Sequence, residues 1–96
     1  MNVLDVCSAL SNETRLNLIS ILLNESPMTG KSAHELFVEQ YEDRRRQSIH
    51  SALEKLVEAE IVEKSYSKED GGIVYHIPET RLLIDLETLE AKYACE

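Results

Sequence analysis

The spacing of apolar residues changes at Ile61 in this chain of 96 residues. Upstream, apolar side chains recur at steps of three and four, which is the period of an amphipathic helix. Downstream, two short segments rich in β-branched and aromatic residues flank Gly71 and Gly72. Glycines adopt the positive φ angles that a hairpin turn requires. The pattern therefore predicts a helical region followed by a β-hairpin.

Four helices are expected before the hairpin. The first covers residues 3–10, and the second, a strongly apolar helix at the centre of the core, follows the caps Ser11 and Asn12 and ends by Asn24. A turn at residues 29–32 precedes a third helix. Carboxylates at Glu42 and Asp43 suit the positive end of a fourth helix, which continues to about residue 61.

The expected hairpin strands are residues 61–67 and 73–77, and a last helix is expected from about Thr80. Its apolar residues, Leu82, Leu86, Leu89 and Tyr93, follow a four-three-four spacing that is typical of a seam between helices. This order predicts a mainly α (α+β) fold, a winged helix-turn-helix with a β-hairpin wing and a C-terminal dimerisation helix. Residues 1–96 would form one domain, with the helix-turn-helix at 29–60, the wing at 61–78 and dimerisation helices at 1–10 and 79–96.

The overall charge restricts the function classes. Acidic residues outnumber basic ones by 18 to 10, and the formal net charge is −8. An anionic protein does not coat nucleic acid or anionic membranes indiscriminately, because its mean field repels phosphate. DNA binding would need a local basic patch, and a dimer would present two. A domain this short buries only about 60–65% of its unfolded surface, which leaves it either marginally stable or dimeric.

Enzymatic chemistry has no support in the sequence. His34, His50 and His76 are scattered, and no nucleophile stands beside a base. We expect no enzyme, no metal, no cofactor and no identifiable small-molecule ligand. The longest nearly apolar run, residues 18–23, is too short to cross a membrane, and the N-terminus has no secretory signal, so a cytoplasmic protein is expected.

The start of the expected fourth helix is basic. It carries three successive arginines and no acid until Glu54. Arginine can bind guanine, glutamine can bind adenine, and serine can bind phosphate. With Ile49, Leu53 and Leu56 facing the core, the outward side chains predict a DNA-binding surface; a solvated polar face is the alternative. The candidate DNA-binding residues are Arg44, Arg45, Arg46, Gln47, Ser48, His50, Ser51 and Lys55, with Lys64 and Lys68 from the wing.

Several segments resemble ArsR-type winged helix-turn-helix regulators. They are ALSNETRL at residues 9–16, HEL at 34–36, LEKLVEAEIV at 53–62 and VYHI at 74–77. The resemblance implies a homodimeric transcriptional regulator that binds double-stranded DNA. Three features depart from the family pattern. About two extra residues fall between the third and fourth expected helices. Glu60 stands where the family usually has glycine, and the recognition helix lacks the cysteine pair of metal-sensing members.

In that family the first and last helices pack together and build the dimer interface. The resemblance therefore implies an interface of Val3, Cys7, Leu82, Leu86, Leu89 and Tyr93. It also implies that Cys7 and Cys95 could approach each other. Three interpretations stay open for these cysteines: two unconnected residues, a disulfide or redox pair, or a metal site completed by a histidine.

The sequence thus predicts a homodimeric, sequence-specific DNA-binding transcriptional regulator, with residues 44–55 in the major groove of a pseudo-palindromic operator. One alternative is an acidic winged-helix module for protein–protein interaction that does not bind DNA. Another is a redox- or metal-responsive version of the same regulator.

Overall fold

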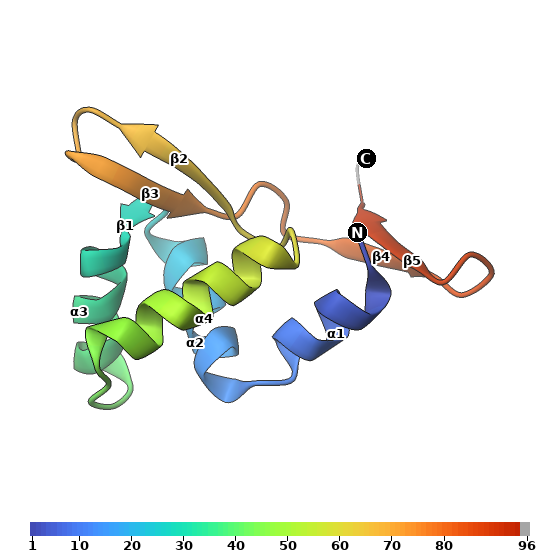
Figure 1. Cartoon of the computed structure of the whole chain (residues 1–96), viewed down its shortest axis with the longest axis horizontal. Helices are drawn as coiled ribbons and strands as arrows, with labels where there is room; N and C mark the ends of the chain where they lie inside the picture. The colour runs from blue at the N-terminus through green and yellow to red at the C-terminus, as the bar shows by residue number, and fades with distance from the viewer. Residues whose placement is uncertain (95–96) are drawn as a thin grey trace.

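Helices enclose most of the core in the computed structural model, which describes residues 1–94 (Figure 1). The helices are α1 (Val3–Leu10), α2 (Glu13–Asn24), α3 (Gly30–Gln40) and α4 (Arg46–Glu58). The strands are β1 (Met28–Thr29), β2 (Glu63–Ser67), β3 (Gly72–His76), β4 (Leu82–Asp85) and β5 (Glu90–Tyr93). No helix among the described residues is both long enough and apolar enough to cross a membrane.

Side-chain caps fix where the first three helices begin. Asn2 accepts hydrogen bonds from the backbone N–H groups of Leu4 and Asp5. Asn12 caps α2 and Thr29 caps α3 in the same way, each through its side-chain oxygen. These caps satisfy N–H groups that have no partner inside the helix. The boundaries at the starts of α2 and α3 were therefore readable from the sequence.

The core lies where α2 meets the other elements. Helix α2 contacts α1, α3, α4 and β3. The largest fully buried side chains include Leu18 and Leu22 of α2, Phe37 of α3, and Ile49, Leu53 and Leu56 of α4. The helix is not buried on all sides, however. Leu16 and Leu23 are about half exposed, at 46% and 50%, so the apolar run of α2 is wider than the core that it fills.

The middle of the chain forms a winged helix-turn-helix, as predicted. Helices α3 and α4 pack together, and β2 and β3 form the wing. A third strand, β1, lies beside β3 in the order β1-β3-β2, with Met28 opposite Tyr75. Two residues are too few to produce a periodic signal, so the sequence did not predict β1. Ile61 and Val62 are buried in the connection that leads to β2 rather than belonging to the strand.

The start of α4 was predicted too early. The helix begins at Arg46, and its N-cap, Arg45, makes no side-chain capping bond. Glu42 and Asp43 therefore belong to the connection from α3, not to the first turn, and Arg44 lies outside the helix as well. Carboxylates close to the positive end of a helix are favourable, but they do not by themselves determine which residue begins the helix.

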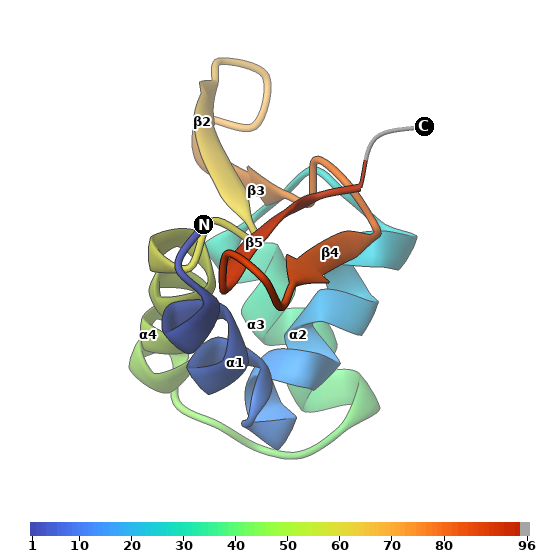
Figure 2. The same ribbon diagram turned by 90° about the vertical axis from the view of Figure 1, so that its right-hand side faces the viewer.

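The predicted C-terminal helix is wrong: residues 82–93 form the β4–β5 hairpin (Figure 2). Leu82 and Ile84 also alternate with period two, and they stand opposite Tyr93 and Ala91, of which Ala91 is buried in the core. Short apolar runs fit both periods. The hydrogen bonds of the turn favour the hairpin over the helix. Asp85 Oδ1 accepts hydrogen bonds from the N–H groups of Glu87 and Thr88, a side-chain turn that competes with helix.

Helix α4 ends in a Schellman motif centred on Glu60. The N–H of Ile61 donates to the carbonyl of Leu56, and the N–H of Glu60 donates to that of Val57. This geometry places Glu60 in the left-handed region, with φ at 64°. Glycine adopts that conformation without a steric penalty, whereas other residues are strained there. This explains why the regulators that the sequence resembles have glycine at the corresponding position.

We expect Glu60→Gly to raise the free energy of unfolding by about 1 kcal/mol, because it relieves the strained φ at the end of α4. Urea unfolding followed by circular dichroism measures the change. Glu60→Ala is the matched control. It removes the same contact with the N-terminal amine, 3.8 Å from Glu60 Oε2, but keeps a Cβ at the strained position. Equal stability of the two variants would show that strain is not the cause.

Candidate nucleic-acid interface

The outer face of α4 is polar and continuous. Packing of Ile49, Leu53 and Leu56 into the core leaves Gln47 and Ser51 at the middle of the opposite face. The flanks of this face carry cationic and hydroxyl side chains. Each flank borders a cleft, one toward α2 and the other toward the wing.

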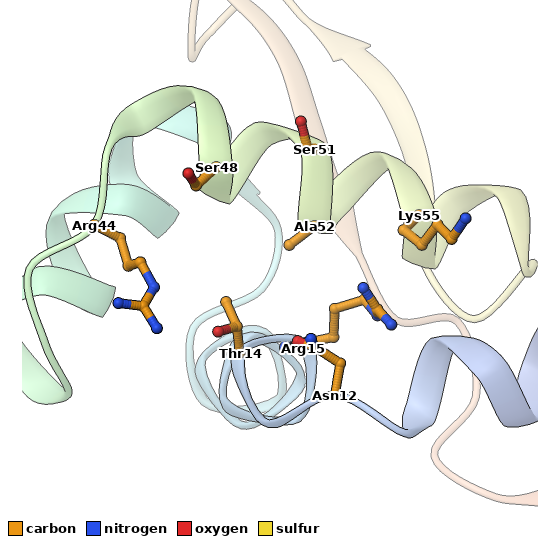
Figure 3. Close-up of a pocket in the computed structure, with 8 residues that line it drawn as sticks. All are labelled: Asn12, Thr14, Arg15, Arg44, Ser48, Ser51, Ala52 and Lys55. Carbon is orange, nitrogen blue, oxygen red and sulfur yellow. Dashed lines mark hydrogen bonds between the residues drawn. The ribbon is translucent and has the colours of Figure 1, made fainter.

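The first cleft, between α4 and the start of α2, has a volume of about 430 Å³. Figure 3 shows Arg44 reaching into it from the connection before α4, with Thr14 and Arg15 below on α2 and Lys55 at the far end. Its lining is Asn12, Thr14, Arg15, Arg44, Ser48, Ser51, Ala52 and Lys55, which includes three cations, three hydroxyl groups and no carboxylate. The site is therefore electropositive within an acidic protein.

The three cations of this cleft are held differently. Arg15 donates from Nε to the carbonyl of Ala9 at 2.7 Å and from Nη2 to that of Ser8 at 3.0 Å, so it also anchors the end of α1. Arg44 forms an ion pair with Glu42 at 2.5 Å. Within the part of the chain that the structure describes, the side chain of Lys55 has no hydrogen bond or ion pair. Lys55 is thus the cation of this cleft that is available without breaking another contact.

The second cleft lies between α4 and the wing and has a volume of about 440 Å³. Its cationic lining residues are Lys31 of α3, Arg46 at the start of α4, and Lys64 of β2, and its one carboxylate is Asp70. His50 of α4 also lines it. The two clefts therefore place cations on both flanks of the same helix face, and they hold six of the ten lysines and arginines of the chain.

Helix α4 carries two acids, Glu58, which is exposed at its last turn, and Glu54, which is half-buried. The wing neutralises Glu54. Lys64 Nζ lies 2.7 Å from Glu54 Oε1, and the hydroxyl of Tyr75 donates to Glu54 Oε2 at 3.0 Å. The hydrogen bond from Lys64 is the main cause that lowers the pKa of the Glu54 carboxyl. Burial, and then the bond to Glu54, raise the pKa of Tyr75 to about 12. The cluster ties both wing strands to α4 and offsets a charge that would repel phosphate.

The structure distributes the predicted site residues over several places. Gln47 and Ser51 lie on the outer face, and Arg45 stands exposed at the N-cap. Lys68 lies beyond β2 in the turn of the wing and lines neither cleft. The remaining predicted residues, Arg44, Arg46, Ser48, His50, Lys55 and Lys64, line one cleft or the other.

Sequence reasoning missed the contributions of α2 and α3. In the sequence, Thr14 and Arg15 belong to a segment that resembles a family motif, and Asn12 is a helix cap. Lys31 lies in the expected turn before the third helix. Their side chains reach the flanks of α4 because the helices pack side by side. A lone basic residue at the first turn of a helix gives no sign in the sequence of which distant helix it will face.

The predicted dimer residues do not share one helix face. Leu86 and Leu89 lie in the β4–β5 turn and are 80% and 63% exposed. Tyr93 is partly buried, and its hydroxyl donates to the carbonyl of Glu60 within the same chain. Val3 and Leu82 pack partly against the core.

Cys7 is free and exposed, whereas Cys95 lies outside the described residues, so the three interpretations of these cysteines stay open. Among residues 1–94, no three His, Cys, Asp or Glu side chains are grouped to hold a metal ion.

Comparisons with known proteins relate the fold to a solved structure. No known protein family and no curated protein matches the sequence. Chains of solved structures do match, among them the ferric uptake regulator from Pseudomonas aeruginosa, determined with manganese. The match has a TM-score of 0.64 and 14% sequence identity, and it covers 100% of this chain and 76% of the other. The likeness establishes a shared fold with a regulator.

We expect Tyr75→Phe to lower the free energy of unfolding by about 1 kcal/mol near neutral pH, because it removes a hydrogen bond to a charged carboxylate. The folded-state pKa of Tyr75, about 12, exceeds the ordinary value of 10.0. Its stabilising contribution is therefore complete below pH 10 and is lost as the pH rises toward 12.

Urea unfolding as a function of pH measures this effect. In Tyr75→Phe the decline of stability between pH 10 and 12 should be shallower than in the unmodified protein. Tyr66→Phe is the control, because Tyr66 is 68% exposed and lies in the same hairpin. Identical pH profiles for Tyr75→Phe and the unmodified protein would contradict the assigned hydrogen bond.

Proposed function

We propose that this protein is a sequence-specific, DNA-binding transcriptional regulator that acts as a homodimer. The observation that carries the proposal is the pair of cation-lined clefts on the two flanks of α4. A protein with net charge −8 would repel DNA if its cations were spread evenly. Concentration of six cations around one helix gives that face the opposite sign from the rest of the surface.

The dimensions of α4 suit the major groove of DNA. An α-helix with side chains is about 10–12 Å wide, and the major groove of B-DNA is about 12 Å wide. With α4 in the groove, Gln47 and Ser51 would face base edges. The first cleft would meet the phosphates of one strand, with Lys55 as the available cation. The second would meet those of the other strand, with Lys31 and Arg46.

A dimer would duplicate this arrangement. Two-fold symmetry would impose a pseudo-palindromic site whose half-sites lie about one helical turn of DNA apart. The motifs shared with ArsR-type regulators support this assignment, and so does the fold shared with a ferric uptake regulator. In a redox-responsive version of the same regulator, the exposed thiol of Cys7 would be accessible to oxidants.

The competing proposal is an acidic module that binds a basic protein rather than DNA, which the net charge of −8 favours. Selection of bound duplexes from a random-sequence library by the purified protein tests the two directly. Enrichment of a two-fold symmetric sequence would support the regulator. Failure to retain any duplex, even at low salt, would support the interaction module.

We expect Lys55→Ala and Lys31→Ala each to weaken duplex binding about uniformly over sequences. Each should reduce the slope of log affinity against log salt by about one, because one phosphate contact is lost. Fluorescence anisotropy over a salt series measures both. Lys92→Ala is the matched control, since Lys92 is exposed on β5 and lines neither cleft. An equal reduction of the salt slope by all three variants would show that DNA does not bind at these two clefts.

We expect Gln47→Ala to change base preference rather than the salt slope. A side chain that contacts a base edge contributes about 1–3 kcal/mol of discrimination at that position. Competition between the selected duplex and single-base variants measures the loss. If Gln47→Ala weakened every duplex equally and lowered the salt slope, Gln47 would contact the backbone instead of a base.

A further inference from the structure

Strand β4 has an open edge. Within residues 1–94 it has one neighbouring strand, β5. The other side of β5 is occupied, because Asn2 forms a bridge with Glu90 and the N–H of Ala91 donates to the carbonyl of Met1 at 3.2 Å. Within the described residues, the N-terminal segment therefore covers the start of β5 on its outer side, whereas no strand covers β4.

The hydrogen bonds of the hairpin show which backbone groups face outward. The carbonyl of Arg81 accepts from the N–H of Ala94 at 3.0 Å, and that of Asp85 accepts from the N–H of Leu89 at 2.8 Å. The backbone groups of successive residues in an antiparallel strand point to opposite sides, so those of residues 81, 83 and 85 share the side that faces β5. The N–H and C=O groups of Leu82 and Ile84 therefore point away from β5, toward the open edge.

This edge lacks the usual protection against pairing with another strand. Natural sheets block exposed edges with lysine, proline or bulges. Residues 82–85 contain none of these, and the side chains of Leu83 and Ile84 are 47% and 43% exposed. The exposed leucines of the adjoining turn, Leu86 and Leu89, enlarge the apolar surface. The edge thus has both the hydrogen-bonding groups and the apolar side chains that a partner strand would cover.

The sequence of the strand is complementary to itself. In an antiparallel pair, outward-facing residues must stand opposite outward-facing residues. If Leu82 stands opposite the partner's Ile84, Leu83 lies on the two-fold axis and Arg81 stands opposite the partner's Asp85. This register pairs apolar with apolar residues and cation with anion, twice. Asp85 Oδ1 is engaged in its own turn, so Oδ2 accepts from the guanidinium. A guanidinium has five N–H donors, so this pair does not require that Arg81 lack other contacts.

We propose that β4 pairs with β4 of a second copy of this chain, in the register centred on Leu83, to form the four-stranded sheet β5-β4-β4-β5. The interface is symmetric, as two-fold dimers require. It deepens the proposed function and rests on its homodimer, since it names the surface that joins the copies. Residues 81–86 line neither cleft, so this pairing leaves the outer face of α4 clear for DNA.

Cysteine cross-linking tests the register. In a Cys7→Ser/Cys95→Ser background, Leu83→Cys should form an interchain disulfide under dissolved oxygen. Opposed residues of a non-hydrogen-bonded pair have Cα atoms about 4.5 Å apart, which a disulfide can span. Leu86→Cys is the matched control. Position 86 is more exposed, but in this register its two copies would lie six residues out of alignment, about 20 Å apart. We expect dimer from the first variant and monomer from the second on non-reducing gels.

Sedimentation equilibrium of the protein with native Leu83 provides the second measurement. We expect a dimer, and at least a tenfold weaker association for Leu83→Arg, which would place two like charges face to face, while Ile73→Arg in the wing leaves the dimer intact. A monomer at all concentrations, a dimer unaffected by Leu83→Arg, or efficient cross-linking at both cysteine positions would overturn the proposal. Anisotropy with the selected duplex is measured separately. A dimer that does not bind the duplex would refute the proposed DNA-binding function but would not contradict the proposed interface.

Discussion

Burial of one face of α4 is the constraint on which the rest of the candidate site depends. Ile49, Leu53 and Leu56 are fully buried against the other helices, and this burial fixes the rotation of α4 about its axis. Gln47 and Ser51 consequently face solvent. The same packing brings α2 and the wing alongside, so the flanks of α4 become clefts lined by other elements. A rotation of α4 about its axis by one residue would bury cations and eliminate both clefts.

Charge is distributed in accordance with this geometry. The cations gather around α4, and Glu54, the half-buried one of the helix's two carboxylates, is neutralised by Lys64 and Tyr75. The remaining acids give the rest of the surface its negative sign. In the proposed function this asymmetry would orient the protein on DNA, since phosphate would be attracted to one face and repelled by the others. The open edge of β4 presents the apolar side chains of Leu83 and Ile84, which suits a second copy of the chain.

The helical half of the fold was predictable because its signals agree. In α2 and α3, periodicity and side-chain caps indicate the same boundaries, and Glu60 marks the end of α4 even without the expected glycine. The last segment was mispredicted because its signals conflict. Leu82, Leu86, Leu89 and Tyr93 have helical spacing, whereas the turn bonds of Asp85 and the burial of Ala91 select a hairpin. Burial of Ala91 depends on α1, which no local pattern reveals.

The sequence by itself determined the order of the helices, the wing and the basic start of α4, because those features depend on spacing and charge within a few residues of one another. Tertiary structure alone decided that Arg15 and Lys31 flank α4 and that Arg44 lies outside it. It also decided that a strand edge replaces the expected helical seam. These outcomes depend on contacts between residues far apart in the chain, whose energies outweigh local preference where that preference is divided.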